Sequence, residues 1–217
     1  MRPAAVFDLD GTLIAGTSAE RLLVPWMVRR GVIGVRQLGR SALRALTLPW
    51  AGRTRALRSN KLWLSGVPVD AMLSRMDAFL DDAVAPRWCG PVRARLAELR
   101  REGHAVFLLS GAPEFIVRAV GARLGAEGVV GTAMEVVDGC FTGGLAGPHR
   151  FAAAKPVALH ELADAHGLDL EASWAFADHP SDAAFLECVG HPVAVGSSPE
   201  LLRVARERGW GVVGCQG

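Results

Sequence analysis

The chain has 217 residues, of which 50% are hydrophobic, and its formal net charge at pH 7 is +2. A chain of this size can bury one sizeable core and still has room for a modest inserted domain. It contains no uncharged apolar run of about 18 residues and no pattern typical of a cleavable leader, so we expect no transmembrane segment and a cytoplasmic location.

The cysteines are spread widely along the chain. Cys89, Cys140, Cys188 and Cys215 show no paired spacing of the kind that binds metals. Disulfides are rare in reducing compartments, and we expect these cysteines to be free bystanders in a reducing cytosol.

An apolar run that ends in two carboxylates opens the chain. Val6 and Phe7 are typical of a parallel strand covered on both faces, and Gly11 allows a sharp turn after it. Side chains alternate along a strand, so Asp8 and Asp10 leave its end on the same side. Like charges this close favour a cation such as Mg²⁺ between them, or a proton on one while the other acts as a nucleophile. A plain polar turn is the alternative interpretation.

The next region is helical and basic. Residues 17–84 show helical patterns broken by glycine and proline and no convincing strand, which predicts an inserted helical domain that returns near Pro86. Residues 20–61 hold nine arginines and one lysine against the single acid Glu20, a balance of +9 that leaves −7 for the rest of the chain. We interpret this segment as a basic island on an acidic protein.

Three arginines of this island recur at helical spacing. Arg36, Arg40 and Arg44 would form one stripe on a helix. The stripe allows two interpretations. In the first, it attracts a substrate that has negative charge beyond its phosphate, or an anionic membrane surface that carries this substrate. In the second, it is a solvated face whose positive charge is balanced by the acidic remainder of the chain.

Strands and helices alternate in the rest of the chain. We expect helices over 90–102, from 113 or 114 onward, over 156–166 and over 199–208, strands over 104–109, 129–130, 173–177 and 192–195, and a hairpin over 133–142 that turns at Asp138-Gly139. This alternation predicts an α/β fold with a doubly wound parallel sheet. Ligands bind at the carboxyl ends of such strands, where Asp8, Ser110 and Asp178 fall.

Four polar residues near these strand ends each allow two interpretations. Ser110 either caps the following helix or holds a phosphate with the Gly111 amide. Lys155, one of two lysines in the chain, is either a surface charge or reaches both Asp8 and a phosphate. Asp178 and Asp182, four positions apart, either cap a helix or bind metal directly and through an outer shell. The carboxylates at the first strand favour the functional interpretation in each case.

These motifs together resemble a known family. The chain resembles the haloacid dehalogenase superfamily, in particular its phosphoserine-phosphatase-like branch (subfamily IB). Segments similar to its four signatures follow in order: Asp8–Leu13, Leu108–Gly111, Lys155, and Ala177-Asp178 with Asp182. The resemblance covers nearly the whole chain. It implies a Rossmann-like core over 1–16 and 86–217 and an all-helical cap over 17–85 that governs substrate specificity.

The resemblance also implies a reaction. It is Mg²⁺-dependent hydrolysis of a small-molecule phosphomonoester, with Asp8 as nucleophile, Asp10 as acid and then base, and Lys155 as the third catalytic residue. Mg²⁺ would bind Asp8, the Asp10 backbone carbonyl and Asp178, with Asp182 in support.

Substrate recognition follows the same resemblance. Ser110, Gly111 and Thr12 would bind the phosphate, and Glu20 and Arg58 are candidates for the rest of the substrate. The chain departs from the family where Ala177 replaces a usual glycine and where His179-Pro180 replaces a small polar pair. His179 either tunes the metal site or shapes a loop.

Two rival functions remain at this point. One is a phosphotransferase that passes the aspartyl-phosphate to an acceptor other than water. The other is a catalytically retired module that binds a phospho-ligand or a membrane surface. We expect no nucleic-acid partner, and the sequence does not specify the substrate or the oligomeric state.

Overall fold

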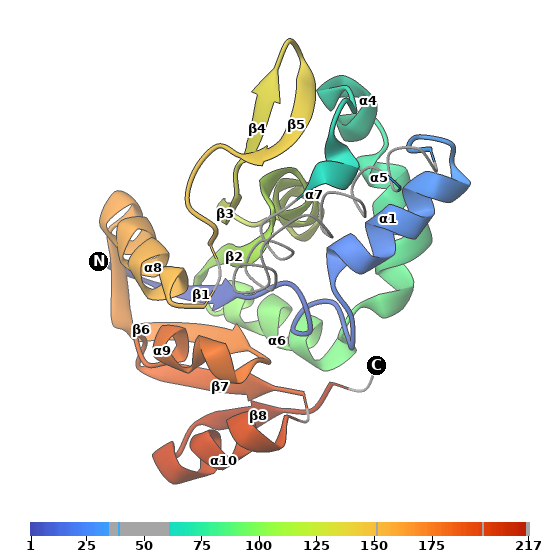
Figure 1. Cartoon of the computed structure of the whole chain (residues 1–217). Helices are drawn as coiled ribbons and strands as arrows, with labels where there is room; N and C mark the ends of the chain where they lie inside the picture. The colour runs from blue at the N-terminus through green and yellow to red at the C-terminus, as the bar shows by residue number, and fades with distance from the viewer. Residues whose placement is uncertain (35–38, 40–60, 151, 197, 216–217) are drawn as a thin grey trace, which may run out of the picture.

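The computed structural model describes residues 1–34, 39, 61–150, 152–196 and 198–215 (Figure 1). The predicted stripe of Arg36, Arg40 and Arg44, and the candidate Arg58, lie outside the described residues. Among the helices described, none has the length and hydropathy needed to span a membrane.

A six-stranded sheet forms the centre of the molecule, and all of its strand pairs are parallel. Its strands are β1 (Arg2–Phe7), β2 (Ala105–Pro113), β3 (Gly128–Thr132), β6 (Leu168–Ala177), β7 (His191–Val195) and β8 (Gly211–Val213). Their spatial order is β3-β2-β1-β6-β7-β8, so the winding direction reverses between β1 and β6. In such sheets ligands bind outside the carboxyl ends of the strands at this reversal.

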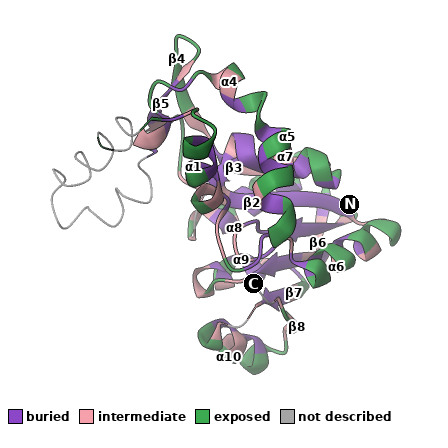
Figure 2. Cartoon of the chain, turned by 90° about the vertical axis from the view of Figure 1, so that its right-hand side faces the viewer, coloured by how far each residue is buried: buried purple, intermediate pink, exposed green. Residues whose placement is uncertain are grey.

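Helices cover both faces of the sheet, as the doubly wound prediction requires. Alternate residues of β1 enter different cores: Ala5 and Phe7 pack with α6 (Gly90–Arg101) and α7 (Glu114–Leu124). Ala4 and Val6 pack on the other face with the remaining core helices, α8 (Ala154–His166), α9 (Ala183–Leu186) and α10 (Pro199–Arg208). Figure 2 shows buried residues along the strands and exposed residues on the outer sides of these helices.

Helical segments joined by turns make up the described part of the region predicted as a cap, with one isolated bridge at Pro68. This region contains α1 (Ala19–Arg29), α4 (Val69–Leu73), α5 (Met76–Phe79), the 3₁₀ segments Leu62–Leu64 and Ala85–Arg87, and a π-helical turn over Leu80–Val84. The chain leaves and returns to the core side by side, since the Ala15 amide donates to the Arg87 carbonyl at 2.7 Å. The division into core and cap stays a prediction, because Leu23 and Phe79 share one apolar cluster with α6 and α7.

A hairpin follows β3, as its Asp-Gly turn predicted. It pairs β4 (Met134–Val137) with β5 (Cys140–Leu145) in antiparallel fashion. Asp138 and Gly139 have φ of 49° and 74°, the positive values that a two-residue hairpin turn requires. The hairpin reaches the helical region, where the Phe141 amide donates to the Val67 carbonyl at 3.0 Å.

The sequence missed three features of the core. β8 is a short edge strand that we had not predicted, and β2 continues four residues past the expected end at Leu109. Cys89 and Cys215 form a disulfide across 126 positions of sequence, so the prediction of four free cysteines was wrong for this pair. Cys140 and Cys188 are free.

Candidate active site

Asp8 lies at the point where the sheet reverses its winding. It follows the last residue of β1, is 4% exposed, and donates its backbone N–H to the Phe176 carbonyl of β6 at 2.9 Å. The parallel β1–β6 pairing therefore continues to Asp8 and brings the end of β6 beside it. Asp178 is the first residue after β6.

Lys155 joins Asp8 to Asp182. Its ammonium lies 2.8 Å from Asp8 Oδ1 and 2.7 Å from Asp182 Oδ2. The lysine is 2% exposed in the first turn of α8, and Asp182 is equally buried in the 3₁₀ turn Pro180–Asp182. Burial on its own lowers the lysine pKa, but the charges of both carboxylates outweigh it and raise the pKa, so Lys155 keeps its proton.

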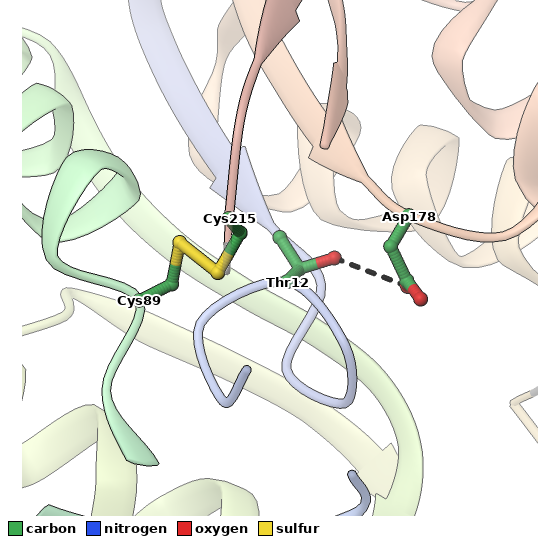
Figure 3. The surroundings of a disulfide bond; sticks show 4 residues. All are labelled: Thr12, Cys89, Asp178 and Cys215. Carbon is green, nitrogen blue, oxygen red and sulfur yellow. Dashed lines mark hydrogen bonds between the residues drawn. A yellow bond between two sulfur atoms is a disulfide. The ribbon is translucent and has the colours of Figure 1, made fainter. Parts of the chain in front are cut away.

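Thr12 and Gly11 both lie close to Asp178, and Thr12 also reaches Asp8. The Thr12 hydroxyl lies 3.5 Å from Asp8 Oδ2 and 3.3 Å from Asp178 Oδ1, and the second contact is drawn in Figure 3. A Cβ on Gly11, whose φ is +78°, would come within 2.0 Å of Asp178 Oδ2. Only glycine permits both this backbone and this close approach.

Asp10 turns toward the start of α1. Its Oδ1 accepts the Ala19 N–H at 2.7 Å, which leaves Oδ2 for another partner. Burial raises the pKa of Asp10 to about 7, and the charge of Asp8 adds to this effect. A carboxyl with a pKa near neutrality can both donate and accept a proton at physiological pH.

The site holds more carboxylates than its single lysine balances. Burial raises the pKa of Asp8, an effect that Lys155 opposes. Burial and the charge of Asp8 together raise the pKa of Asp178 to about 7. Asp182 Oδ1 is buried without a hydrogen-bond partner in the described part of the chain. The crowding of Asp8 and Asp178 is a charge environment that suits a bound cation.

The donors at this site are oxygen atoms, which Mg²⁺ prefers. No cluster of three histidine, cysteine or acidic side chains converges among the described residues. Mg²⁺ commonly takes one or two carboxylates and keeps several waters or substrate oxygens. Asp8, Asp178 and the backbone carbonyl of Asp10 can supply such a set.

Ser110 lies inside β2 and does not cap α7. The helix begins at Glu114 with Pro113 as its capping residue, so the capping interpretation was wrong. Ser110 is 1% exposed, and its Oγ accepts the Ala112 N–H at 3.2 Å, which leaves the hydroxyl proton free to be donated. The register of Phe7 with Leu108 places this serine next to the end of β1.

The structure places the remaining candidates as follows. Glu20 lies in the first turn of α1, where it forms an ion pair with Lys61. His179 is exposed, and its Nδ1 accepts the Ser181 N–H at 3.1 Å, so the imidazole shapes the turn before Asp182. Lys61 had no assigned role, although its rarity as one of two lysines was the signal used for Lys155.

The disulfide lies beside the loop that carries Gly11 and Thr12. Figure 3 shows Cys89 and Cys215 next to the turn that carries Thr12. The Cys89 amide donates to the Leu13 carbonyl at 2.9 Å. The bond therefore joins the chain after β8 to the backbone that directly supports this loop.

Comparisons with known proteins found similar sequences over nearly the whole chain. A family model described as haloacid dehalogenase-like hydrolase matches residues 5–187. A putative hydrolase of Mycobacterium leprae (strain TN) is 30% identical over 221 residues, which cover 95% of this chain and 71% of the relative. A phosphoserine phosphatase of Mycobacterium tuberculosis (strain ATCC 25618 / H37Rv) is 31% identical over 221 residues, which cover 95% of this chain and 69% of the relative.

Solved structures share the fold at lower identity. A protein of unknown function from Bordetella pertussis Tohama I has a TM-score of 0.80 at 23% identity, with 98% of each chain covered. A phosphoserine phosphatase solved as a phospho-aspartyl intermediate analogue has a TM-score of 0.63 at 20% identity, with 97% of this chain and 92% of that chain covered.

Proposed function

Because this chain belongs to the haloacid dehalogenase-like hydrolases, we propose that it hydrolyses a small phosphomonoester in two steps through an aspartyl-phosphate on Asp8. The observation that carries this proposal is the buried contact of Lys155 with Asp8 Oδ1 at 2.8 Å, at the winding reversal of the sheet. An anionic nucleophile needs such a fixed cation to approach a phosphate dianion.

In the first step, a carboxylate oxygen of Asp8 attacks phosphorus and the bond from phosphorus to the ester oxygen breaks. Asp10 gives its proton to the departing oxygen. The amide of Ala19 fixes one Asp10 oxygen at 2.7 Å, so the other is available for this transfer.

In the second step, water attacks the phosphorus of the aspartyl-phosphate. Asp10, now ionised, takes the proton of that water, and the bond from Asp8 to phosphorus breaks to release inorganic phosphate. A phosphotransferase would use the same intermediate with another acceptor, and product analysis separates the two reactions.

The other residues bind and orient the phosphoryl group. Lys155 fixes the Asp8 carboxylate and neutralises negative charge, while Asp182 holds the lysine. The buried Ser110 hydroxyl can donate to a phosphate oxygen. Thr132 donates to the Gly111 carbonyl at 2.9 Å and so fixes the backbone beside that serine.

Mg²⁺ is the cofactor that we propose for this site. Asp8, Asp178 and the Asp10 carbonyl would hold it, and it would neutralise negative charge on the phosphoryl oxygens. The cytoplasmic location stays a prediction.

A phosphate-release assay tests the proposal. A panel of amino-acid, sugar, nucleotide and lipid phosphates is screened with wild-type protein, with Asp8→Asn, and with wild type in EDTA. We expect the wild type to release phosphate in the presence of Mg²⁺ and not in EDTA. We expect Asp8→Asn to release none, although circular dichroism should show that it is folded. Near-normal release by Asp8→Asn would contradict the assigned nucleophile, and binding without release would support a retired binding module.

A further inference from the structure

A second buried lysine lies in the predicted cap. Lys61 is 5% exposed, and its ammonium pairs with the Glu20 carboxylate. Its backbone is fixed as well, since its amide donates to the Gly143 carbonyl of β5 at 3.2 Å. A Cβ on Gly143 would come within 2.8 Å of the Leu62 Cα, so the two segments pack as closely as glycine allows. Lys61 is therefore held against the hairpin in a defined position.

The pair lies close to the proposed acid. Glu20 directly follows Ala19, whose amide is 2.7 Å from Asp10 Oδ1. Burial is the main cause of the raised pKa of Asp10, and the charge of Glu20 is among the contributions that raise it. If Asp10 protonates the leaving oxygen, the rest of the leaving group lies at the amino end of α1, beside Glu20.

The charges at this position decide which leaving groups are favoured. An unpaired carboxylate beside the leaving group would attract an ammonium group of the substrate. Here the protein supplies that ammonium itself, because Lys61 forms an ion pair with Glu20. The side chains of Lys61 and Glu20 are only 7% and 24% exposed. A substrate ammonium would meet a neutralised carboxylate, the like charge of Lys61, and the positive end of α1.

Building on the proposed phosphatase function, we propose that Lys61 determines substrate choice by occupying Glu20, so that the enzyme takes phosphomonoesters whose leaving group carries no ammonium group. Hydroxyl-bearing leaving groups fit this surface, because the ion pair can accept and donate hydrogen bonds without a net charge. Relatives of this chain are named phosphoserine phosphatase, and the inference predicts that phosphoserine is a poor substrate here.

Two substrates that differ in one group provide the test. O-phospho-L-serine and L-glycerate 3-phosphate have the same carbon skeleton, carboxylate and phosphate, and differ in an ammonium against a hydroxyl. Any contact of Lys61 with the shared carboxylate therefore cancels in the ratio of their kcat/KM values. We expect the wild type to favour the glycerate ester about tenfold, an effect equal to a modest electrostatic contact.

Removing the lysine should release the glutamate. In Lys61→Met we expect the ratio to move about tenfold toward phosphoserine, because Glu20 then loses the ammonium that pairs with it. Adding Glu20→Gln should cancel the shift, since no carboxylate remains to attract the ammonium. Arg95→Met is the matched control: it removes a 26% exposed side chain that pairs with Glu98 on α6, and it should leave the ratio unchanged.

A binding measurement keeps the inference testable without turnover. Calorimetric titration of each ester into Asp8→Asn, with and without Lys61→Met, should show phosphoserine gaining about tenfold in affinity relative to the glycerate ester. Because this arm needs no hydrolysis, its failure is distinct from failure of the phosphatase assignment. A wild type that prefers phosphoserine, or a folded Lys61→Met variant with an unchanged ratio in both arms, would overturn the inference.

Discussion

The two lysines of this chain are both buried against carboxylates, and their surroundings differ. Lys155 contacts Asp8 and Asp182 at 2.8 and 2.7 Å at the end of the sheet, where further carboxyl groups crowd and the pKa of Asp178 is raised to about 7. Lys61 balances one carboxylate, Glu20, beside the hairpin. The sheet end therefore has an excess of negative charge that suits phosphoryl chemistry. The pair of Lys61 and Glu20 has no net charge, and we propose that it discriminates between leaving groups.

The largest expected effect separates these two lysines directly. Lys155→Met should lower kcat/KM by about 10²–10³-fold for every ester, because it removes the cation that fixes the nucleophile. It also leaves buried Asp8 and Asp182 without their ammonium, so urea unfolding should show a loss of about 3–5 kcal/mol. Lys61→Met should mainly change the ratio between esters. Equal losses for the two variants on both matched esters would remove the distinction.

A substitution of Asp178 tests whether the carboxylates at the sheet end bind a metal. In Asp178→Asn, with one charge fewer for a cation, the half-saturating Mg²⁺ concentration should rise at least about 100-fold, beyond the usual effect of an outer-shell residue. Activity titrated against Mg²⁺ measures this change. Superimposable titrations for wild type and variant would remove Asp178 from the site.

The same carboxyl predicts a pH dependence. Its pKa is raised from 3.8 to about 7, so the folded protein holds this proton where the unfolded chain has lost it. Stability of the metal-free protein should therefore fall as pH rises from about 4 to 7, and Asp178→Asn should weaken that fall. Thermal unfolding in EDTA at pH 5 and 8 measures this change in stability for both proteins. The same change with pH in the wild type and in Asp178→Asn would contradict the prediction.

A smaller effect is expected at Asp182. Asp182→Asn should reduce kcat about 10–100-fold, the range for a residue that orients another. Because Asp182 Oδ2 accepts a hydrogen bond from the Lys155 ammonium at 2.7 Å and orients that lysine, the half-saturating Mg²⁺ concentration should change little. A large rise in that concentration at unchanged saturated kcat would place Asp182 on the metal instead.

The disulfide should affect turnover least. Cys89→Ser with Cys215→Ser opens a loop of 126 positions, and such bonds typically contribute about 2–4 kcal/mol to stability. Urea unfolding should show this loss, while the ester ratio set by Lys61 stays unchanged. Cys140→Ser is the control, since Cys140 is a free cysteine. Equal stability of the double variant and the control would exclude a structural role for the bond.

The sequence predicted the parts of the site that local patterns specify. The apolar run before Asp8 predicted β1, and the alternation of strands and helices predicted that Asp8 and Asp178 would meet at the sheet edge, because parallel strands end on one side. The Asp138-Gly139 pair predicted the hairpin turn through its need for positive φ.

Features that depend on distant contacts were missed. The pairing of Glu20 with Lys61 spans 41 positions, and that of Cys89 with Cys215 spans 126. Neither pair has a local signature, because each depends on how the hairpin, α1 and the last strand pack. β8 has only three residues. Although Val212 and Val213 favour a strand, a run this short is defined by its hydrogen bonds to β7.

The covalent state of Asp8 during turnover tests the central claim most directly. Protein mixed with a substrate from the release screen and Mg²⁺ is quenched in acid, reduced with borohydride, and mapped by peptide mass spectrometry. We expect reduction at Asp8 in the wild type, as an acyl-phosphate requires, and no modified peptide in Asp8→Asn. An unmodified Asp8 in protein quenched at saturating substrate, or a phosphoryl group on another residue, would contradict the account.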